Sequence, residues 1–176
     1  MESDSRIPIV LVVGRAKTGK TTLVVKLVSI FKARGIRVAT IKHHPHDFEI
    51  DREGKDTYRH KQAGAVLTMI ASPSKMAMVK DLDEELRLQE LVEQFVRDVD
   101  LVIAEGFKGE PFPKIEVYDP RDEPPATIGD PNLLAVLCDM PLDAGVPLFK
   151  RDDARSVADL IAERVLRKGN PGSPKG

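Results

Sequence analysis

The feature that most constrains this chain is the glycine-rich segment at residues 14–21, GRAKTGKT. It fills every fixed position of the pattern G-x-x-x-x-G-K-[ST], in which backbone N–H groups surround a phosphate. The aliphatic run before it, residues 7–13, predicts a buried strand, and apolar residues at helical spacing after it predict a helix over residues 19–34. Because strand, loop and helix are the context that this motif requires, the segment indicates a phosphate-binding loop.

The positions of this loop have separate expected roles. Gly14 and Gly19 let the backbone turn with its N–H groups facing inward. Lys20 is placed to reach the outer phosphates of a nucleotide, and the Thr21 hydroxyl is placed to ligate Mg²⁺. We expect the nucleotide to contact the whole loop and the residue after it: Gly14, Arg15, Ala16, Lys17, Thr18, Gly19, Lys20, Thr21 and Thr22.

The order of apolar and amphipathic segments predicts the fold. Strands are expected at residues 7–13, 36–42, 100–104, 114–118, 133–138 and 146–149, a hairpin at 65–72 and 75–82, and helices at 19–34, 55–63, 83–99 and 153–166. Such a succession is typical of a three-layer α/β/α P-loop NTPase fold with a mostly parallel central sheet. We expect one domain over residues 7–167, disordered tails at 1–6 and 168–176, and ligand at the carboxyl ends of the strands.

Composition limits the classes of partner and the cellular compartment that we expect for this chain. A net charge of −1 gives no global attraction to nucleic acid or to an anionic membrane, so neither is an expected partner. The single cysteine, Cys138, lies in an apolar run and cannot build a disulfide framework. No apolar stretch approaches the roughly 20 residues that span a bilayer, and the first residues, MESDSR, do not resemble a signal peptide. We therefore expect a cytoplasmic protein.

Carboxylates at strand ends are the candidates for holding Mg²⁺ opposite Thr21. Glu105 follows four apolar residues of a predicted strand, and Asp47 and Asp51 lie in the polar loop after the strand at residues 36–42. We expect Thr21, Glu105 and Asp47 to ligate the metal, and Lys20, Glu105 and Asp47 to be the catalytic residues. A surface glutamate at a strand end and aspartates that form turns or cap helices are the alternatives.

Basic residues and histidines near the carboxyl ends of the predicted strands each have more than one interpretation. Lys42, Lys55, Arg59 and Lys108 could bind a second anionic ligand, although solvated surface charge is the usual role of such residues. The histidines of the H-H-x-H motif at residues 43–46 suggest zinc, but a closed zinc site wants four ligands and no cysteine is near. We favour polar loop residues close to phosphate or substrate.

Three stretches together resemble one known family, molybdopterin-guanine dinucleotide biosynthesis protein B (MobB). They are GRAKTGKT, then KHHPHDFEIDREGKDTYRHKQAGA at residues 42–65, and DLVIAEGFK at 100–108 followed by PKIEV at 113–117. The resemblance covers about residues 7–166. It implies a dimeric GTP-binding P-loop protein with weak GTPase activity, which assists the guanylyltransferase that joins GMP to molybdopterin. GTP and Mg²⁺ are the implied ligands, and molybdopterin stays open as a third.

The resemblance also implies roles by position. Lys20 and Thr21 would serve phosphate and Mg²⁺, Glu105 would serve the Mg²⁺ site, and Lys108 matches the family as well. A switch-like segment would contain Asp47, Asp51, Lys55, Asp56 and Arg59. The sequence lacks an N-K-x-D guanine-reading motif, so guanine rests on the resemblance, with Asp139 as the candidate acceptor for a guanine edge. Residues 15–17 are also more basic than is usual in the family.

Three functions remain in competition on the sequence alone. The first is an accessory GTPase, the second a small-molecule kinase or ligase similar to dethiobiotin synthetase, and the third a carrier that binds cofactor without hydrolysing nucleotide. Nucleoside kinases usually carry an arginine-rich lid helix late in the chain, and this sequence has none. The apolar hairpin at residues 65–82 has few of the charges that blunt a sheet edge, which predicts a homodimer.

Overall fold

β1 (Ile9–Val13) is an inner strand of a fully parallel sheet, and the computed structural model places its neighbours far along the chain. The sheet order is β2-β5-β1-β6-β7-β8, so β1 lies between β5 (Leu101–Glu105) and β6 (Lys114–Val117). The remaining strands are β2 (Val38–Lys42), β7 (Leu133–Leu137) and β8 (Leu148–Phe149). The expected α/β class with a mostly parallel sheet is confirmed, and the strand ends lie within two residues of the expected ones.

The structure describes residues 7–121 and 124–167, so the tails expected at residues 1–6 and 168–176 lie outside the described residues. The described chain forms two compact units, residues 7–43 with 91–167 and residues 44–90. Each unit is described by itself below.

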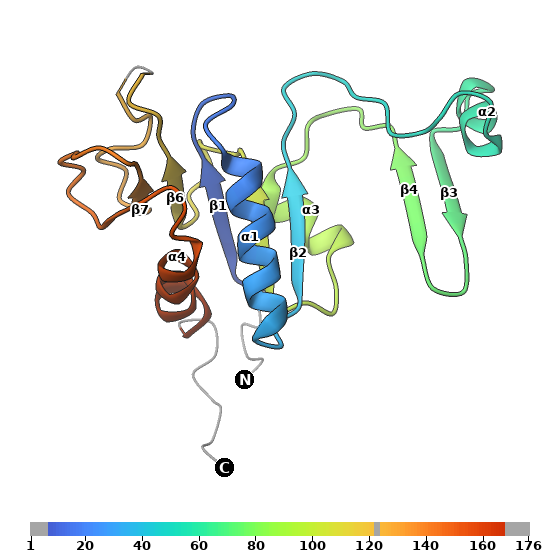
Figure 1. Cartoon of the computed structure of the whole chain (residues 1–176). Helices are drawn as coiled ribbons and strands as arrows, with labels where there is room; N and C mark the ends of the chain where they lie inside the picture. The colour runs from blue at the N-terminus through green and yellow to red at the C-terminus, as the bar shows by residue number, and fades with distance from the viewer. Residues whose placement is uncertain (1–6, 122–123, 168–176) are drawn as a thin grey trace, which may run out of the picture. The chain divides into compact units, whose positions relative to one another are not determined.

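One face of the large sheet is covered by α1 (Lys20–Ala33) and α4 (Ala154–Ile161) (Figure 1). Leu27 and Phe31 of α1 and Val157 and Ile161 of α4 are completely buried in the same core cluster. The helix expected from residue 153 begins where the Asp153 side chain accepts a hydrogen bond from the Ser156 N–H at 3.1 Å, as an N-cap does. It ends in a π-helical turn, Ala162–Leu166.

The opposite face of β6 is buried too, but with charged side chains. Lys114 donates from Nζ to Asp130 Oδ2 at 2.5 Å and to the carbonyls of Lys108 and Glu110, each at 3.1 Å. Glu116 accepts from the backbone N–H groups of residues 126 and 127 and from the hydroxyl of Thr127. These bonds hold the segments before and after β6 against the strand. Buried charges of this kind are stable only when hydrogen-bond partners are supplied.

The apolar stripe over residues 83–99 predicts a longer helix than the structure contains. The structure has α3 only at Leu88–Phe95, which corrects the expectation at both ends. The Glu90 carboxylate accepts the Arg87 N–H at 2.8 Å, which satisfies a donor that the start of a helix leaves free. Beyond the helix, Asp98 adopts a left-handed backbone conformation with φ of 58°, so the helix cannot continue to residue 99.

The second unit holds a short helix and a two-stranded antiparallel hairpin. The strands β3 (Leu67–Ala71) and β4 (Met76–Lys80) form the hairpin expected at residues 65–82, and in its register Met69 lies opposite Met78. The turn between them is held by the Ser72 side chain, whose Oγ accepts the Lys75 N–H at 3.1 Å. The helix α2 (Asp56–Gln62) precedes the hairpin. Among the described helices of both units, none combines the length and the apolarity that crossing a bilayer requires.

Candidate functional site

The register of the parallel strands brings the predicted loop and the predicted carboxylate to one edge. Val12 of β1 pairs with Glu105 of β5, and Lys42 of β2 pairs with the other side of Glu105. Gly14 therefore starts the loop directly beside the carboxyl ends of both neighbours of β1. A Cβ atom on Gly14 would stand 2.3 Å from the Val117 carbonyl oxygen of β6, so this position admits only glycine.

The loop is tied together by its own side chains. The buried Thr18 donates from Oγ1 to the Arg15 carbonyl at 3.0 Å, and Lys20 donates from Nζ to the same carbonyl at 2.5 Å. Gly19, the residue before α1, takes a φ of 104°, which favours glycine there. Burial lowers the pKa of the Lys20 ammonium below its usual range; Glu105 opposes this shift and Lys42 adds to it. The loop thus has the compact, cationic form that phosphate binding requires.

The Thr21 hydroxyl meets the Glu105 carboxylate across 84 residues of sequence. Its Oγ1 lies 3.1 and 2.9 Å from the two carboxylate oxygens, and Lys42 Nζ lies 3.5 Å from one of them. Hydroxyl and carboxylate oxygens are the donors that Mg²⁺ prefers, so these two residues fit the metal. No group of three or more His, Cys, Asp or Glu side chains with metal-binding geometry occurs in the described part of the chain. A metal held here would therefore take its other ligands from phosphate and water.

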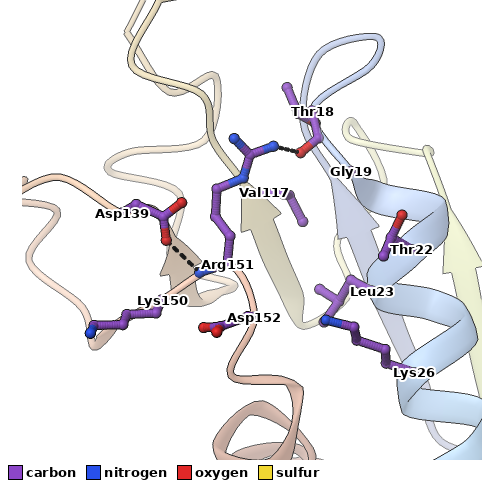
Figure 2. A pocket seen from close by; sticks show the side chains of 10 residues that line it. All are labelled: Thr18, Gly19, Thr22, Leu23, Lys26, Val117, Asp139, Lys150, Arg151 and Asp152. Atoms are coloured by element: carbon purple, nitrogen blue, oxygen red, sulfur yellow. Dashed lines mark hydrogen bonds between the residues drawn. The ribbon is translucent and has the colours of Figure 1, made fainter.

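A cavity of about 590 Å³ opens beside the loop, at the carboxyl ends of β6, β7 and β8 (Figure 2). Its walls come from the loop and α1 on one side and from the chain after β7 and β8 on the other. The lining residues are Thr18, Gly19, Thr22, Leu23, Lys26, Val117, Asp139, Lys150, Arg151 and Asp152. Asp139, which the sequence suggested as a guanine acceptor, lines this cavity and accepts the Arg151 backbone N–H at 3.0 Å.

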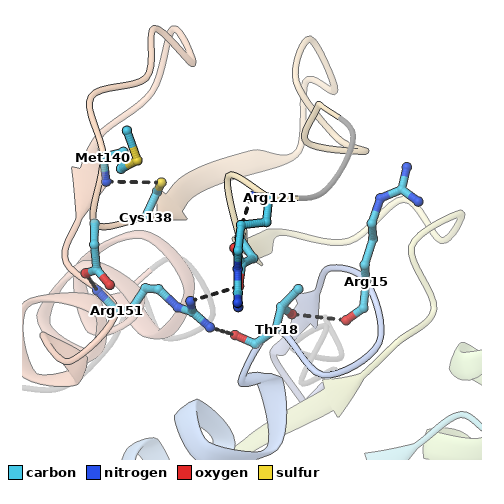
Figure 3. A network of polar contacts seen from close by, with 8 residues as sticks. Arg15, Thr18, Arg121, Cys138, Met140 and Arg151 are labelled. Carbon is cyan, nitrogen blue, oxygen red and sulfur yellow. Dashed lines mark hydrogen bonds and ion pairs between the residues drawn. The ribbon is translucent and has the colours of Figure 1, made fainter.

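Arg151 links three segments around this cavity, and sequence reasoning missed it. Its guanidinium donates through Nη2 to the Thr18 carbonyl of the loop (Figure 3), and Nη1 lies 3.4 Å from Oδ2 of Asp119. Asp119 itself is buried and paired with Arg121 through two side-chain hydrogen bonds. The Arg121 side chain and N–H, and next the charge of Arg151, hold the pKa of the Asp119 carboxyl far below its usual range. The available signal was the pair of cations, Lys150 and Arg151, that follows the strand expected at residues 146–149.

Five other predicted site residues belong to the second unit. Asp47, Asp51, Lys55, Asp56 and Arg59 all belong to the second unit, and their roles at a nucleotide stay predictions. Within that unit Lys55 precedes α2, and its carbonyl accepts the Arg59 N–H at 3.0 Å. In the first unit, the Lys108 carbonyl accepts a hydrogen bond from Lys114 at 3.1 Å, and the role of the Lys108 ammonium at an anionic ligand stays a prediction.

The histidines of the H-H-x-H motif divide between two kinds of contact. The His43 ring lies 5.0 Å from the Phe107 ring at the end of β5, centroid to centroid. His44 and His46 contact each other within the second unit, with His44 Nδ1 2.9 Å from the His46 carbonyl. In the part of the chain that the structure describes, these histidines do not join a group of three or more potential metal ligands, and their proximity to phosphate or substrate stays a prediction.

The parallel sheet, the glycine-rich loop after its inner strand and the Thr21–Glu105 contact define an α/β protein of the P-loop-like class. The sequence model of the family described as "Molybdopterin guanine dinucleotide synthesis protein B" (MobB) matches residues 9–139. The chain belongs to this family.

Curated relatives and solved structures agree with this assignment. The chain is 37% identical over 175 residues to the molybdopterin-guanine dinucleotide biosynthesis adapter protein of Escherichia coli (strain K12), covering 96% of this chain and 99% of the relative. It is 36% identical to the protein of the same name from Haemophilus influenzae, covering 90% of this chain and 89% of the relative. The crystal structure of Bacillus subtilis MobB superposes with a TM-score of 0.74 at 30% identity, covering 90% of this chain and 98% of that one.

Proposed function

We propose that this chain binds GTP with Mg²⁺ at the loop of residues 14–21 and acts as a nucleotide-dependent adapter in the biosynthesis of molybdopterin guanine dinucleotide. The observation that carries the proposal is the Thr21–Glu105 contact, since it joins the loop to a carboxylate at the position where a P-loop protein holds its metal. The printed names of the two curated relatives, both called biosynthesis adapter proteins, support the pathway. The partner would be the guanylyltransferase that attaches GMP to molybdopterin.

In this proposal the residues of the first unit do the binding. The backbone N–H groups of the loop and the Lys20 ammonium contact the phosphates, and Thr21 and Glu105 hold Mg²⁺, which would neutralise phosphate charge. The cavity beside the loop, whose lining includes Thr22, Leu23 and Asp139, takes the ribose and base. Weak GTPase activity follows from this arrangement, because charge neutralisation at the phosphates favours attack by water even where no base is positioned.

The second unit supplies an argument for a homodimer. Leu67, Met69 and Met76 lie on one face of the β3–β4 hairpin and are 41, 51 and 63% exposed. A two-stranded sheet is marginal in water unless its apolar face is covered. A second copy of the chain would cover this face, as symmetric dimers bury matching patches.

The experiment that tests the binding site is titration calorimetry with GTP and Mg²⁺ on the wild type and on Lys20→Ala. The substitution removes a charged donor to the outer phosphates and no core contact, so we expect at least about a 100-fold loss of affinity with an unchanged melting temperature. Arg155→Ala, which removes an exposed cation from α4, is the matched control and should bind as the wild type does. Near-wild-type affinity in Lys20→Ala would overturn the assignment of the loop.

A groove next to the metal position favours the kinase or ligase as the second candidate. It measures about 390 Å³ and is lined by apolar residues of α1 and β2 together with Thr21 and Glu105. An acceptor substrate bound there would lie near the outer phosphate. Nucleotide consumption that requires a small-molecule acceptor, without the guanylyltransferase, would support this candidate over the adapter.

A further inference from the structure

We infer that Arg151 is a positioning residue for phosphate binding: it holds the Thr18–Gly19 peptide in the orientation that directs the Gly19 N–H toward the nucleotide. The inference rests on the proposed function, because it assigns Arg151 a role in the proposed nucleotide site. It concerns the β-phosphate rather than the base.

Arg151 fixes the orientation of the peptide plane between Thr18 and Gly19. Arg151 Nη2 donates to the Thr18 carbonyl, and the described chain contains no cis peptide bond. In a trans peptide the C=O and the following N–H point in opposite directions. A guanidinium that holds the Thr18 carbonyl on one side therefore turns the Gly19 N–H to the other side, away from Arg151.

The Thr18–Gly19 peptide lies at the point where the loop enters α1. Gly19 is the residue before α1, and its carbonyl accepts the first helical hydrogen bond, from the Leu23 N–H at 3.0 Å. N–H groups at this point of a glycine-rich loop are those that surround a phosphate at a helix N-terminus. With a φ of 104°, the backbone at Gly19 is in a region where a peptide can rotate between several orientations. An external donor that selects one of them pre-organises the loop.

The Arg151 side chain is itself held in place. Arg151 is anchored at both ends, by its own N–H to Asp139 Oδ1 at 3.0 Å and by its guanidinium to Asp119. Asp139 follows β7 (Figure 2) and Asp119 follows β6, so both anchors of Arg151 come from segments that directly follow strands of the sheet. The Arg151 side chain is 29% exposed and is held on two sides. It can therefore keep the Thr18 carbonyl at a fixed position relative to the sheet.

The test compares nucleotides that differ only in the number of phosphates. GDP and GMP are titrated by competition against a fluorescent guanine nucleotide, with wild type, Arg151→Met, Arg151→Lys and Arg155→Met as the exposed control. For Arg151→Met we expect about a tenfold loss of GDP affinity, the equivalent of one hydrogen bond to a charged group, and less than about a twofold change for GMP. Arg151→Lys should recover part of the loss, since an ammonium can still donate to one carbonyl. Arg155→Met should change neither value.

Two outcomes contradict the inference. Equal losses for GDP and GMP would place Arg151 at the base, the ribose or the α-phosphate, and unchanged GDP affinity in Arg151→Met would leave it without a role in phosphate binding. If Arg151→Met does not fold, Asp119→Asn tests the same clamp by weakening its anchor, with an expected loss of about threefold for GDP alone. Failure of the proposed function is distinct from these results, because the wild type would then bind no guanine nucleotide.

Discussion

The hydroxyl of Thr21 lies 2.9 Å from one carboxylate oxygen of Glu105, which joins the first turn of α1 to the end of β5. If this pair holds Mg²⁺, Glu105→Gln removes the charge on which the metal depends while keeping the shape of the side chain. We expect at least about a tenfold loss of GTP affinity in the presence of Mg²⁺, and less than about a twofold change in GDP affinity without Mg²⁺. Titration calorimetry in both conditions measures this, with Glu163→Gln, at an exposed glutamate of the turn Ala162–Leu166, as control. Equal losses in the two conditions would assign Glu105 a structural role instead.

The apolar face of the hairpin predicts the oligomeric state. Light scattering at micromolar concentration should show a dimer, and Met69→Lys should shift it to the monomer, because the introduced charge would have to be buried opposite Met78. Val25→Lys changes an apolar residue of α1 that is 63% exposed and should leave the dimer intact. A monomeric wild type would contradict the proposal.

Glu116 predicts a large effect on stability at a position outside the nucleotide site. Glu116→Ala leaves two backbone N–H groups and the Thr127 hydroxyl without the acceptor that now satisfies them. We expect the free energy of unfolding to fall by about 3 kcal/mol, the usual cost of removing one partner from a buried charged network. Urea denaturation measures this. Glu163→Ala, an exposed glutamate, should stay within about 0.5 kcal/mol of the wild type.

The Arg37–Asp100 pair predicts a pH dependence of stability. The guanidinium and the N–H of Arg37 lower the pKa of Asp100 from 3.8 to about 2. Since the folded pKa is below the unfolded one, the contribution of the pair is fully present above about pH 4 and is lost as the pH falls toward 2. The difference in melting temperature between the wild type and Asp100→Asn should therefore narrow between pH 5 and pH 2. In an Arg37→Met background the same difference should be smaller and nearly constant.

Local pattern was enough to predict one half of the site and not the other. The glycine-rich loop and Glu105 could be identified because each carries its context in adjacent residues, an aliphatic strand followed by glycine. Arg151 and Asp119 carry no such context: each is a charged residue in a polar connection, and only the parallel register of β6, β7 and β8 brings them to the loop. The start of α3 was missed for a related reason, since an apolar stripe does not indicate at which residue a side chain such as Glu90 caps the helix.

The position of β1 in the sheet has a consequence for how the chain is made. β1 and β2 are both synthesised before residue 43, yet they are not neighbours, because β5 lies between them. Both neighbours of β1 come after residue 100, so an emerging chain of that length has two apolar strands and no partner for either within the large sheet. Folding of this sheet must wait for β5 and β6, as expected of non-local parallel topologies. The glycine-rich loop is thus synthesised well before β5 and β6, the strands that complete its site.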